Sequence, residues 1–321
     1  MKKILVTVVL TFIMMRRFCC PFTFSVLNKN VKSNYNKKKN GRPFSVLLHC
    51  HQYQQSILGY NQNDNLTPYT IVDCPPTDPE VLSSVVQKYS TQFNVWLKHK
   101  PIANHTRQAF DMLHLTTTMN STTKIILDSG CGTARSTELL ADLYPDHLVI
   151  GIDRSFVRLN RNVVYRKNTN FNTHNDLIHT RRDKPNLRLV RAELADFWRC
   201  CLEANLTISR HYLLYPNPYP KKCRLTSRWY AHPSFPLLFR LGGSQIIIKS
   251  NWNLYLQEFS QAVLYSTTFD EHARPYMDSA KKGPVERIDK SVAWTNFEKK
   301  YDDVGEKTFE LVLEKSDVML S

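Results

Sequence analysis

The stretch IILDSGCGTARST, residues 125–137, decides how this chain is expected to fold. It begins with an apolar run typical of a buried strand, passes through Asp128 to Gly130 and Gly132, and then takes on helical spacing. Glycine tolerates a positive φ and lets a backbone come close to a ligand. The stretch therefore predicts a strand, a tight ligand-binding turn and a helix, which is one unit of an α/β fold.

The residues of this turn indicate what it binds. Dinucleotide-binding proteins place G-x-G-x-x-G here, and Arg135 stands where the third glycine would be. An arginine side chain obstructs the close helix–strand packing that this glycine permits. Asp128 would also repel a pyrophosphate. It suits a cationic group instead, such as the amino group of S-adenosylmethionine.

Short apolar runs alternate with amphipathic segments as far as residue 264. Strands are expected at 125–127, 148–152, 187–190, 212–215 and 245–249. Helices are expected between and after them at 133–144, 155–161, 193–202 and 254–264. This alternation favours a Rossmann-like α/β fold, with a doubly wound, mostly parallel sheet flanked by helices. The polar, aperiodic stretch 166–186 is expected to be an inserted loop.

Two helices are expected before this α/β region. The first opens with a capping box formed by Thr77 and Glu80 and continues with helical apolar spacing. The second covers about residues 104–115. Contact with a substrate and simple packing are both open as their role.

Acids also follow the second and third predicted strands. Asp153 is placed to accept hydrogen bonds from both hydroxyls of a ribose, and Glu193 lies near the expected adenine. Each acid has a simpler explanation, since Asp153 can cap the following helix and Glu193 can favour a helix N-terminus. Three acids after three successive strands, together with the glycine turn, resemble class I S-adenosylmethionine-dependent methyltransferases.

The fourth predicted strand runs into YPNPYPKK, residues 215–222. Proline cannot donate to a sheet ladder, so the strand ends near Tyr215 and the prolines stiffen the loop. Asn217-Pro218-Tyr219 resembles the Asn/Asp-Pro-Pro-aromatic loop of enzymes that methylate nitrogen on planar groups. In such a loop the ring stacks on a base and the amide bonds the edge of the base. The alternative is a proline-rich turn with Tyr219 packed inward.

Three segments in order resemble one family, the tRNA (guanine-N7)-methyltransferases. YPNPYPKKCRLTSRWYAHPSF, residues 215–235, is similar to its (F/Y)PDPW-K…RR segment. SNWNLYLQEF, residues 250–259, resembles its acid-Trp-x-x-Tyr segment, and WTNFEKKYDDVGEKTFEL, residues 294–311, matches T-x-F-E-x-(K/R)-…-G. The resemblance covers about residues 124–314.

The resemblance implies a role for each matching residue. S-adenosylmethionine would be held by Asp128, Gly130, Gly132, Asp153 and Glu193. The catalytic residues would be Asn217, which faces the guanine, and Tyr219. The tRNA would be contacted by Lys221, Arg224, Arg228, Asn251, Thr295, Phe297 and Glu298.

These substrate contacts are of two kinds. Arg224 and Arg228 would meet tRNA phosphates, which position a substrate without reading its sequence. Asn251 and the segment 295–298 would close over the target base. A solvated basic face is the alternative explanation of the charges near residue 222.

The chain departs from the family pattern at Asn217 and Asn251, where the family usually has Asp. Guanine N7 carries an in-plane lone pair, so no base has to remove a proton before methylation. Asparagine keeps a carbonyl acceptor for the guanine N1–H or N2–H while giving up the anion. Activity is therefore expected to survive both departures.

The expected function is methylation of guanine N7 in the variable region of tRNA, with S-adenosylmethionine as cofactor and tRNA as partner. The resemblance alone implies guanine 46. Two alternatives stay open. One is another S-adenosylmethionine-dependent N-methyltransferase of RNA or protein, and the other is a non-catalytic RNA-binding subunit with the same fold.

The first 63 residues contain ten Lys or Arg and no acid. Subtracting these ten from the total of 43 leaves 33 basic side chains against 28 acidic ones, so much of the net charge of +15 belongs to this segment. The uncharged run 4–15 is too short to span a membrane, which takes about 20 residues, but fits a signal peptide. A basic, Asn- and Lys-rich stretch follows it. Together they predict a plastid-type organelle leader, with a mitochondrial leader or a basic tail of a cytoplasmic protein as alternatives.

Three regions follow from these patterns: a leader at 1–63, a helical extension at 64–120 and a methyltransferase domain at 121–321. The eight cysteines show no C-x-x-C and no zinc-ligand spacing, so neither a metal site nor a disulfide framework is expected. No stable membrane association of the mature domain is expected. The sequence leaves the need for a protein partner open.

Overall fold

The computed structural model describes residues 75–115, 124–161, 177–180 and 183–316. All of them belong to one compact unit, residues 64–321. The predicted leader and most of the predicted inserted loop lie outside the described residues.

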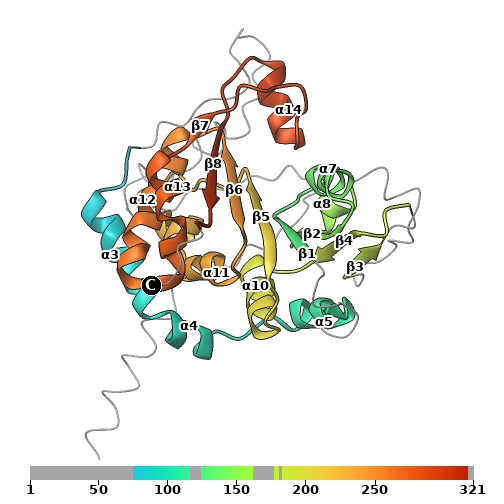
Figure 1. Cartoon of the computed structure of the whole chain (residues 1–321), viewed down its shortest axis with the longest axis horizontal. Helices are drawn as coiled ribbons and strands as arrows, with labels where there is room; N and C mark the ends of the chain where they lie inside the picture. Colours follow the sequence, from blue (N-terminus) through green and yellow to red (C-terminus); the bar gives the residue numbers. More distant parts are fainter. Residues whose placement is uncertain (1–74, 116–123, 162–176, 181–182, 317–321) are drawn as a thin grey trace, which may run out of the picture. The chain divides into compact units, whose positions relative to one another are not determined.

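An eight-stranded sheet in the order β3-β4-β2-β1-β5-β6-β8-β7 forms the centre of this unit (Figure 1). Its strands are β1 (Lys124–Ser129), β2 (His147–Asp153), β3 (Ile178–Thr180), β4 (Leu187–Arg191), β5 (Ile208–Leu214), β6 (Gln245–Ser250), β7 (Val285–Glu286) and β8 (Phe309–Glu314). The five central strands, β4, β2, β1, β5 and β6, run parallel. Strands β3, β8 and β7 pair antiparallel. The predicted Rossmann-like, mostly parallel sheet is confirmed.

The three antiparallel strands were not predicted. β3 lies within the stretch 166–186 that was expected to be a loop. β8 pairs with β6 along six residues and β7 adds a short edge. Pairing with a strand distant in the sequence stabilises these segments, and no local pattern reports such pairing.

Helices and short 3-10 turns surround the sheet. Before β1 come α3 (Pro79–Thr91), α4 (Phe93–His99) and α5 (Asn104–Met112). The others are α7 (Arg135–Leu143), α8 (Phe156–Leu159), α10 (Leu194–Glu203), η1 (Lys222–Ser227), η2 (Trp229–Ala231), α11 (Phe235–Arg240), α12 (Asn253–Phe269), η3 (Glu271–Tyr276), α13 (Met277–Lys282) and α14 (Asn296–Asp303).

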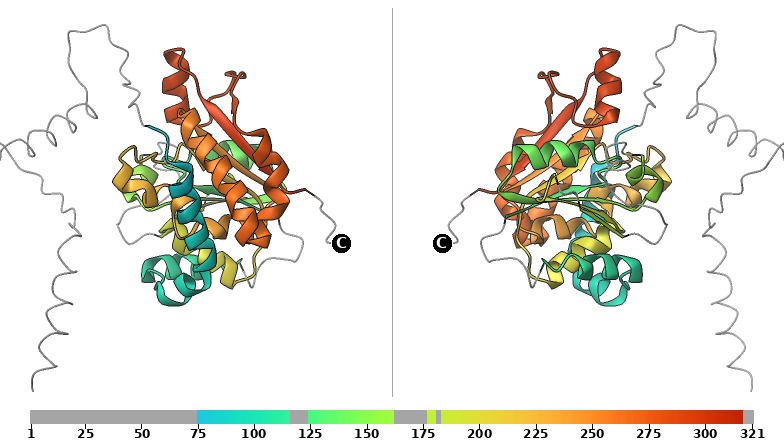
Figure 2. Two further views of the ribbon diagram at one scale, coloured as in Figure 1. Left: turned by 90° about the vertical axis from the view of Figure 1, so that its left-hand side faces the viewer. Right: turned by 90° about the vertical axis from the view of Figure 1, so that its right-hand side faces the viewer.

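Side-chain alternation along the strands divides the core between the two faces of the sheet. Ile125, Leu127 and Ile150 belong to a large cluster with residues of α3, α4, α5, α10, α11 and α12. Ile126 and Val149 belong to a smaller cluster with residues of α7 and α8. The right-hand view of Figure 2 shows α7 on one side of the sheet and α10 with α5 on the other.

The first helix begins differently from the expectation. The predicted capping box used Thr77, but the N-cap of α3 is Asp78, whose carboxylate accepts from the N–H of Glu80 at 2.8 Å. The N–H of Thr77 instead donates to Glu258 of α12. The cap therefore shifts by one residue because Thr77 takes a tertiary partner.

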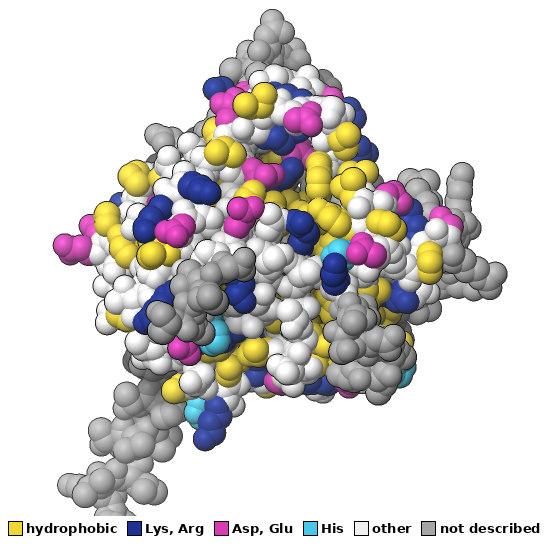
Figure 3. Space-filling model, viewed as in Figure 1, with side chains coloured by type: hydrophobic (Ala, Val, Ile, Leu, Met, Phe, Trp, Pro, Cys, Tyr) yellow, Lys and Arg dark blue, Asp and Glu magenta, His cyan; other side chains and the backbone are white. Residues whose placement is uncertain are grey.

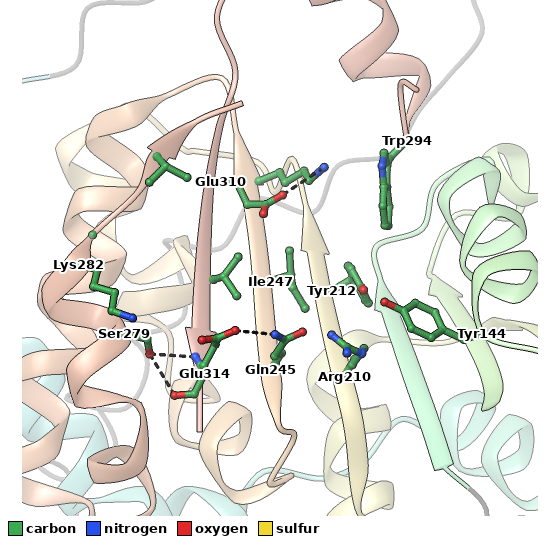
Figure 4. Close-up of a pocket in the computed structure, with 14 residues that line it drawn as sticks. Tyr144, Arg210, Tyr212, Gln245, Ile247, Ser279, Lys282, Trp294, Glu310 and Glu314 are labelled. Carbon is green, nitrogen blue, oxygen red and sulfur yellow. Dashed lines mark hydrogen bonds and ion pairs between the residues drawn. The ribbon is translucent and has the colours of Figure 1, made fainter. Parts of the chain in front are cut away.

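The smaller cluster leaves part of one sheet face open. Over β5, β6 and β8 on the α7 side lies a groove of about 470 Å³, lined by Tyr212, Ile247 and Val312 and bordered by charged residues. Figure 3 shows hydrophobic side chains gathered in this hollow, and Figure 4 shows Trp294 above it, stacked on Tyr212 with 5.8 Å between ring centroids. None of the predicted site residues lines this groove.

Candidate active site

A second cavity, of about 560 Å³, lies at the carboxyl ends of the parallel strands. Ligands of doubly wound sheets bind at this edge. Five of the residues predicted from the sequence line it: Gly130, Asp153, Glu193, Asn217 and Tyr219. They come from the ends of β1, β2, β4 and β5, so the parallel register of the sheet brings them together.

The glycine turn has the predicted geometry. Gly130 and Gly132 have φ angles of +83° and +60°, which a side chain would strain. The N–H groups of Gly130 and Cys131 both donate to the carbonyl of Ile152, at 2.7 and 3.1 Å, and this ties the turn to the end of β2. A Cβ atom at Gly130 would have no neighbour nearer than 3.9 Å. The turn therefore leaves open space where a ligand is expected.

Asp128 lies buried at the base of this turn, with 1% of its surface exposed. Its Oδ2 accepts hydrogen bonds from the hydroxyls of Ser136, at 2.6 Å, and Thr137, at 2.7 Å. Its Oδ1 is buried without a hydrogen-bond partner. Burial raises the pKa of Asp128 to about 6, although the two hydroxyls oppose the shift. Asp128 does not itself line the cavity, but a buried carboxylate oxygen without a partner beside the open glycine turn fits the amino group of S-adenosylmethionine.

Asp153 bonds to its own loop and also lines the cavity. Its Oδ2 accepts from the N–H of Gly132 at 3.1 Å, and its Oδ1 accepts from the N–H of Ser155 at 2.7 Å. The exposed Arg158 pairs with the same carboxylate at 3.2 Å. The N-cap of α8 is Ser155, whose hydroxyl accepts the N–H of Arg158, so the capping alternative is wrong for Asp153. Its carboxylate is also held where a ribose is expected.

Glu193 is the N-cap residue of α10, but its side chain makes no capping hydrogen bond. Its backbone N–H donates to the Thr106 hydroxyl of α5 at 3.1 Å. The carboxylate is half-buried and lines the cavity. Glu193 thus lines the cavity, and its contact with the adenine end of the cofactor stays a prediction.

The loop after β5 holds Asn217 and Tyr219 in a strained conformation. Tyr215 and Tyr219 have φ angles of +53° and +45°, a region that residues with side chains rarely adopt. The Oδ1 of Asn217 accepts the N–H of Tyr219 at 3.2 Å. This bond uses the carbonyl oxygen of the side-chain amide and leaves its NH₂ group as a donor. The predicted role of the Asn217 carbonyl as an acceptor for guanine stays a prediction, and in the structure this oxygen already accepts one hydrogen bond.

Arg228 does not lie where the sequence placed it. It was expected to meet tRNA phosphates at the surface, but only 4% of its surface is exposed. Its guanidinium pairs with Glu258 of α12 at 2.8 Å and donates to the carbonyl oxygens of Tyr219, at 3.2 Å, and Pro220, at 3.4 Å. The sequence could not show this because Glu258 lies 30 residues away on another element. Arg228 thus supports the loop from the protein interior.

Lys221 and Arg224, in contrast, are exposed on and beside η1. Neither lines the cavity. Their positions are compatible with the predicted contacts to a large substrate at the rim.

The predicted C-terminal residues gather on α14, next to the cavity but outside its lining. Thr295 caps this helix by accepting the N–H of Glu298 at 2.9 Å. Glu298 is fully buried and accepts the hydroxyl hydrogen of Tyr215 at 3.0 Å. Phe297 is 40% exposed and its ring packs against that of Tyr215 at a tilt of 41°, with 4.8 Å between ring centroids. The Asn251 amide donates to the Tyr301 hydroxyl at 3.1 Å.

Two further contacts bring α14 to the glycine turn. The Asn296 amide donates to Thr133 at 3.1 Å, and Arg135 donates to the carbonyl of Ala293 at 3.0 Å. The segment therefore lies between the end of β1 and the end of β5. Glu298, which was expected to close over the base, is buried and anchors α14 instead.

The cavity lining also includes residues that the sequence analysis did not single out, among them Trp96, Lys100, Trp229 and His232. They come from the C-terminal part of α4, from η2 and from the segment after it. A tryptophan at helical spacing is most simply explained as core, and no local pattern connects residues 96 and 229. Contacts of α10 with both segments bring them to the site: Arg199 bonds the end of α4, and Trp198 packs against Trp229.

The fold and this cavity together define a Rossmann-like methyltransferase. A family model described as a putative methyltransferase matches residues 122–311, and the chain belongs to that family, the tRNA (guanine-N7)-methyltransferases. S-adenosylmethionine is the cofactor. A comparison with curated proteins finds no match.

A comparison with solved structures also finds matches, three of which follow. A 16S rRNA (adenine(1408)-N(1))-methyltransferase mutant from Catenulisporales acidiphilia, solved with the cosubstrate SAM, is 14% identical over 80% of this chain and 98% of that chain, with a TM-score of 0.38. The antibiotic-resistance methyltransferase Kmr is 18% identical over 64% and 93%, with a TM-score of 0.33. The 16S rRNA methyltransferase KamB is 13% identical over 68% and 95%, with a TM-score of 0.38.

Two absences concern the described residues alone. None of the helices there is long and apolar enough to cross a bilayer. No group of three or more His, Cys, Asp or Glu side chains in the same part of the chain is arranged to hold a metal ion.

Proposed function

We propose that this protein methylates N7 of a guanine in the variable region of tRNA, at position 46 as the family resemblance implies. The observation that carries the proposal is one cavity that joins the cofactor residues to the loop after β5. Gly130, Asp153 and Glu193 line one part of it, and Asn217 and Tyr219 line another. The groups that would hold the methyl donor and those that would hold a planar base therefore share one space.

S-adenosylmethionine supplies an electrophilic methyl group, whose transfer to N7 leaves S-adenosylhomocysteine and places a positive charge on the guanine ring. The protein's task is to align the base, because N7 presents a lone pair and no proton has to be removed first. Tyr219 offers a ring for stacking. The NH₂ group of Asn217 fits the O6 acceptor of guanine, which lies on the same edge of the base as N7.

A rigid loop favours this alignment. Arg228 bonds two carbonyl oxygens of the loop and is itself paired with Glu258. α14 packs on Tyr215 at the start of the loop. The loop is therefore fixed from both sides, as a site that positions a base requires.

The test offers the full-length protein S-adenosylmethionine with a radiolabelled methyl group and a tRNA with guanine in its variable loop. A second tRNA carries adenine at that position. We expect label in N7-methylguanosine from the first tRNA and none from the second. Label in another nucleoside of the first tRNA would support a different RNA N-methyltransferase. Cofactor binding without transfer to any tRNA would support a non-catalytic RNA-binding subunit.

A further inference from the structure

One part of the active-site cavity is lined by residues from segments of the chain that are not predicted to hold the cofactor. These residues are Trp96, Lys100, Trp229 and His232. None of these has a role in the proposed methyl transfer. Their side chains offer aromatic rings, an ammonium group and an imidazole. The region around Asp153 and Glu193 offers carboxylates instead.

The tautomer of His232 follows from its neighbours. Its Nδ1 accepts the backbone N–H of Ser234 at 3.1 Å, so Nδ1 carries no proton. Burial, helped by the charge of Lys100, lowers the pKa of His232 to about 4, so the ring is neutral at pH 7. A neutral ring with a bare Nδ1 carries its proton on Nε2. The half-buried ring therefore supplies an N–H donor in the cavity lining.

Lys100 is exposed at the C-terminal end of α4, and its backbone is held by hydrogen bonds from α10. The buried Arg199 of α10 donates to the carbonyl oxygens of Lys100, at 2.6 Å, and Leu97, at 2.8 Å. The same guanidinium lies 5.3 Å from the ring centroid of Trp96. Arg199 thus fixes both the aromatic ring and the start of the lysine side chain at the cavity.

Trp229 forms the other aromatic wall. Its ring centroid lies 4.9 Å from that of the buried Trp198 and 5.5 Å from that of His232. Rings braced in this way keep their orientation when a ligand binds, so little conformational entropy is lost.

We propose that this region is a subsite for the nucleotide next to the target guanine, whose base stacks on the tryptophans and whose phosphate contacts Lys100 and His232. Aromatic rings with a nearby cation are the usual means of binding single-stranded nucleic acid. A fixed N–H donor and an ammonium group together suit a phosphate oxygen. The subsite is continuous with Asn217 and Tyr219, so one strand can occupy both. The proposal rests on the proposed function.

The test uses the full chain with Lys100→Gln and His232→Phe, and Lys98→Gln as the matched control. Lys98 is an exposed lysine on the same helix that does not line the cavity. Affinity for tRNA without cofactor and affinity for S-adenosylmethionine without tRNA are measured separately, the former over a range of salt concentrations.

Both cavity variants should weaken tRNA binding by about 5–20-fold while cofactor affinity changes by less than about twofold. Lys100→Gln should also reduce the salt slope by about one unit, whereas His232→Phe should not, because the neutral ring releases no counterion. The control Lys98→Gln should bind tRNA with the same affinity as the wild type.

Three results would overturn the subsite. Weaker cofactor binding with unchanged tRNA binding would assign these residues to the carboxylate of the cofactor. Equal losses in Lys98→Gln and Lys100→Gln would indicate a diffuse basic surface. No change in either affinity would leave the residues without a ligand. Because these measurements use binding, they stay informative if the methylated nucleoside proves not to be N7-methylguanosine.

Discussion

Asp128 shows how a single residue can serve ligand binding at a cost in stability. Its carboxylate is buried, one oxygen has no partner, and its pKa is raised from 3.8 to about 6. The folded protein therefore holds this proton more tightly than the unfolded chain does. As the pH rises from about 4 to about 6, ionisation of Asp128 progressively lowers the free energy of unfolding. Above pH 6 the full loss of stability is present.

Asp128→Asn should therefore stabilise the protein without cofactor at pH 7.5, by about 1–3 kcal/mol, and by much less at pH 4. The same change should weaken S-adenosylmethionine binding at pH 7.5, because the amino group loses its anionic partner. Thermal unfolding at both pH values and calorimetric titration at pH 7.5 test the two effects. A variant that is equally stabilised at both pH values would contradict the assigned ionisation.

Arg228 and Arg224 are four residues apart and should respond differently to alanine. Arg228→Ala leaves Glu258 buried without its cation and should destabilise the protein by about 3–5 kcal/mol. Arg224→Ala removes an exposed charge and should change stability by less than about 0.5 kcal/mol. Denaturant unfolding of the two variants distinguishes the two environments.

The same pair separates structure from substrate contact. We expect Arg224→Ala to lower the salt dependence of tRNA binding by about one unit of slope. An unchanged salt dependence would show that Arg224 belongs to a solvated basic face and contacts no tRNA phosphate. A native stability for Arg228→Ala would show that its buried network does not hold the loop.

At the scale of elements, α14 is fastened by a buried cluster of charges. Glu298 pairs with Arg287 at 3.1 Å and with Lys249 at 3.4 Å, and it accepts the Tyr215 hydroxyl hydrogen. Burial and the Glu298 carboxylate raise the pKa of Tyr215, so the hydroxyl keeps its proton as a donor. The helix is thereby joined to the ends of β5 and β6.

Glu298→Gln should loosen this helix. The change removes the buried anion that Arg287 and Lys249 share, although each cation keeps a second carboxylate partner, Asp302 and Glu310 respectively. The cost should be about 1–3 kcal/mol. Amide hydrogen exchange should accelerate in residues 294–303 more than in α7. Lys299→Ala, which removes an exposed pair with Asp303, is the control and should cost less than about 1 kcal/mol. Equal exchange rates in the two variants would contradict the anchoring role of Glu298.

At the scale of the whole molecule, charge is the main evidence for the role of the N-terminal 63 residues, which contain ten Lys or Arg and no acid. We propose that they address the protein to an organelle, with a plastid favoured. A fluorescent fusion of residues 1–63 should enter that organelle, and the same fusion with Lys37, Lys38 and Lys39 changed to Glu should enter it less. A diffuse cytoplasmic signal from the unchanged fusion would contradict the proposal.

Sequence patterns were sufficient where structure is local. The apolar runs and the glycine turn predicted the five parallel strands, because strand, turn and helix signals act over a few residues. The acids Asp153 and Glu193 were correctly placed at the cavity, since the ends of parallel strands always meet at one edge. The same patterns gave no sign of β3, β7 or β8, which are stabilised by pairing across the sheet.

What the sequence by itself determined is therefore the α/β class, the glycine turn and the loop with Asn217 and Tyr219. Only the tertiary structure decided that Arg228 and Glu298 are buried supports and that Trp96, Lys100, Trp229 and His232 line the site. The reason is physical. An arginine has the same local signature at a surface and in a buried ion pair, and its environment is set by a carboxylate that the chain brings back from a distant helix.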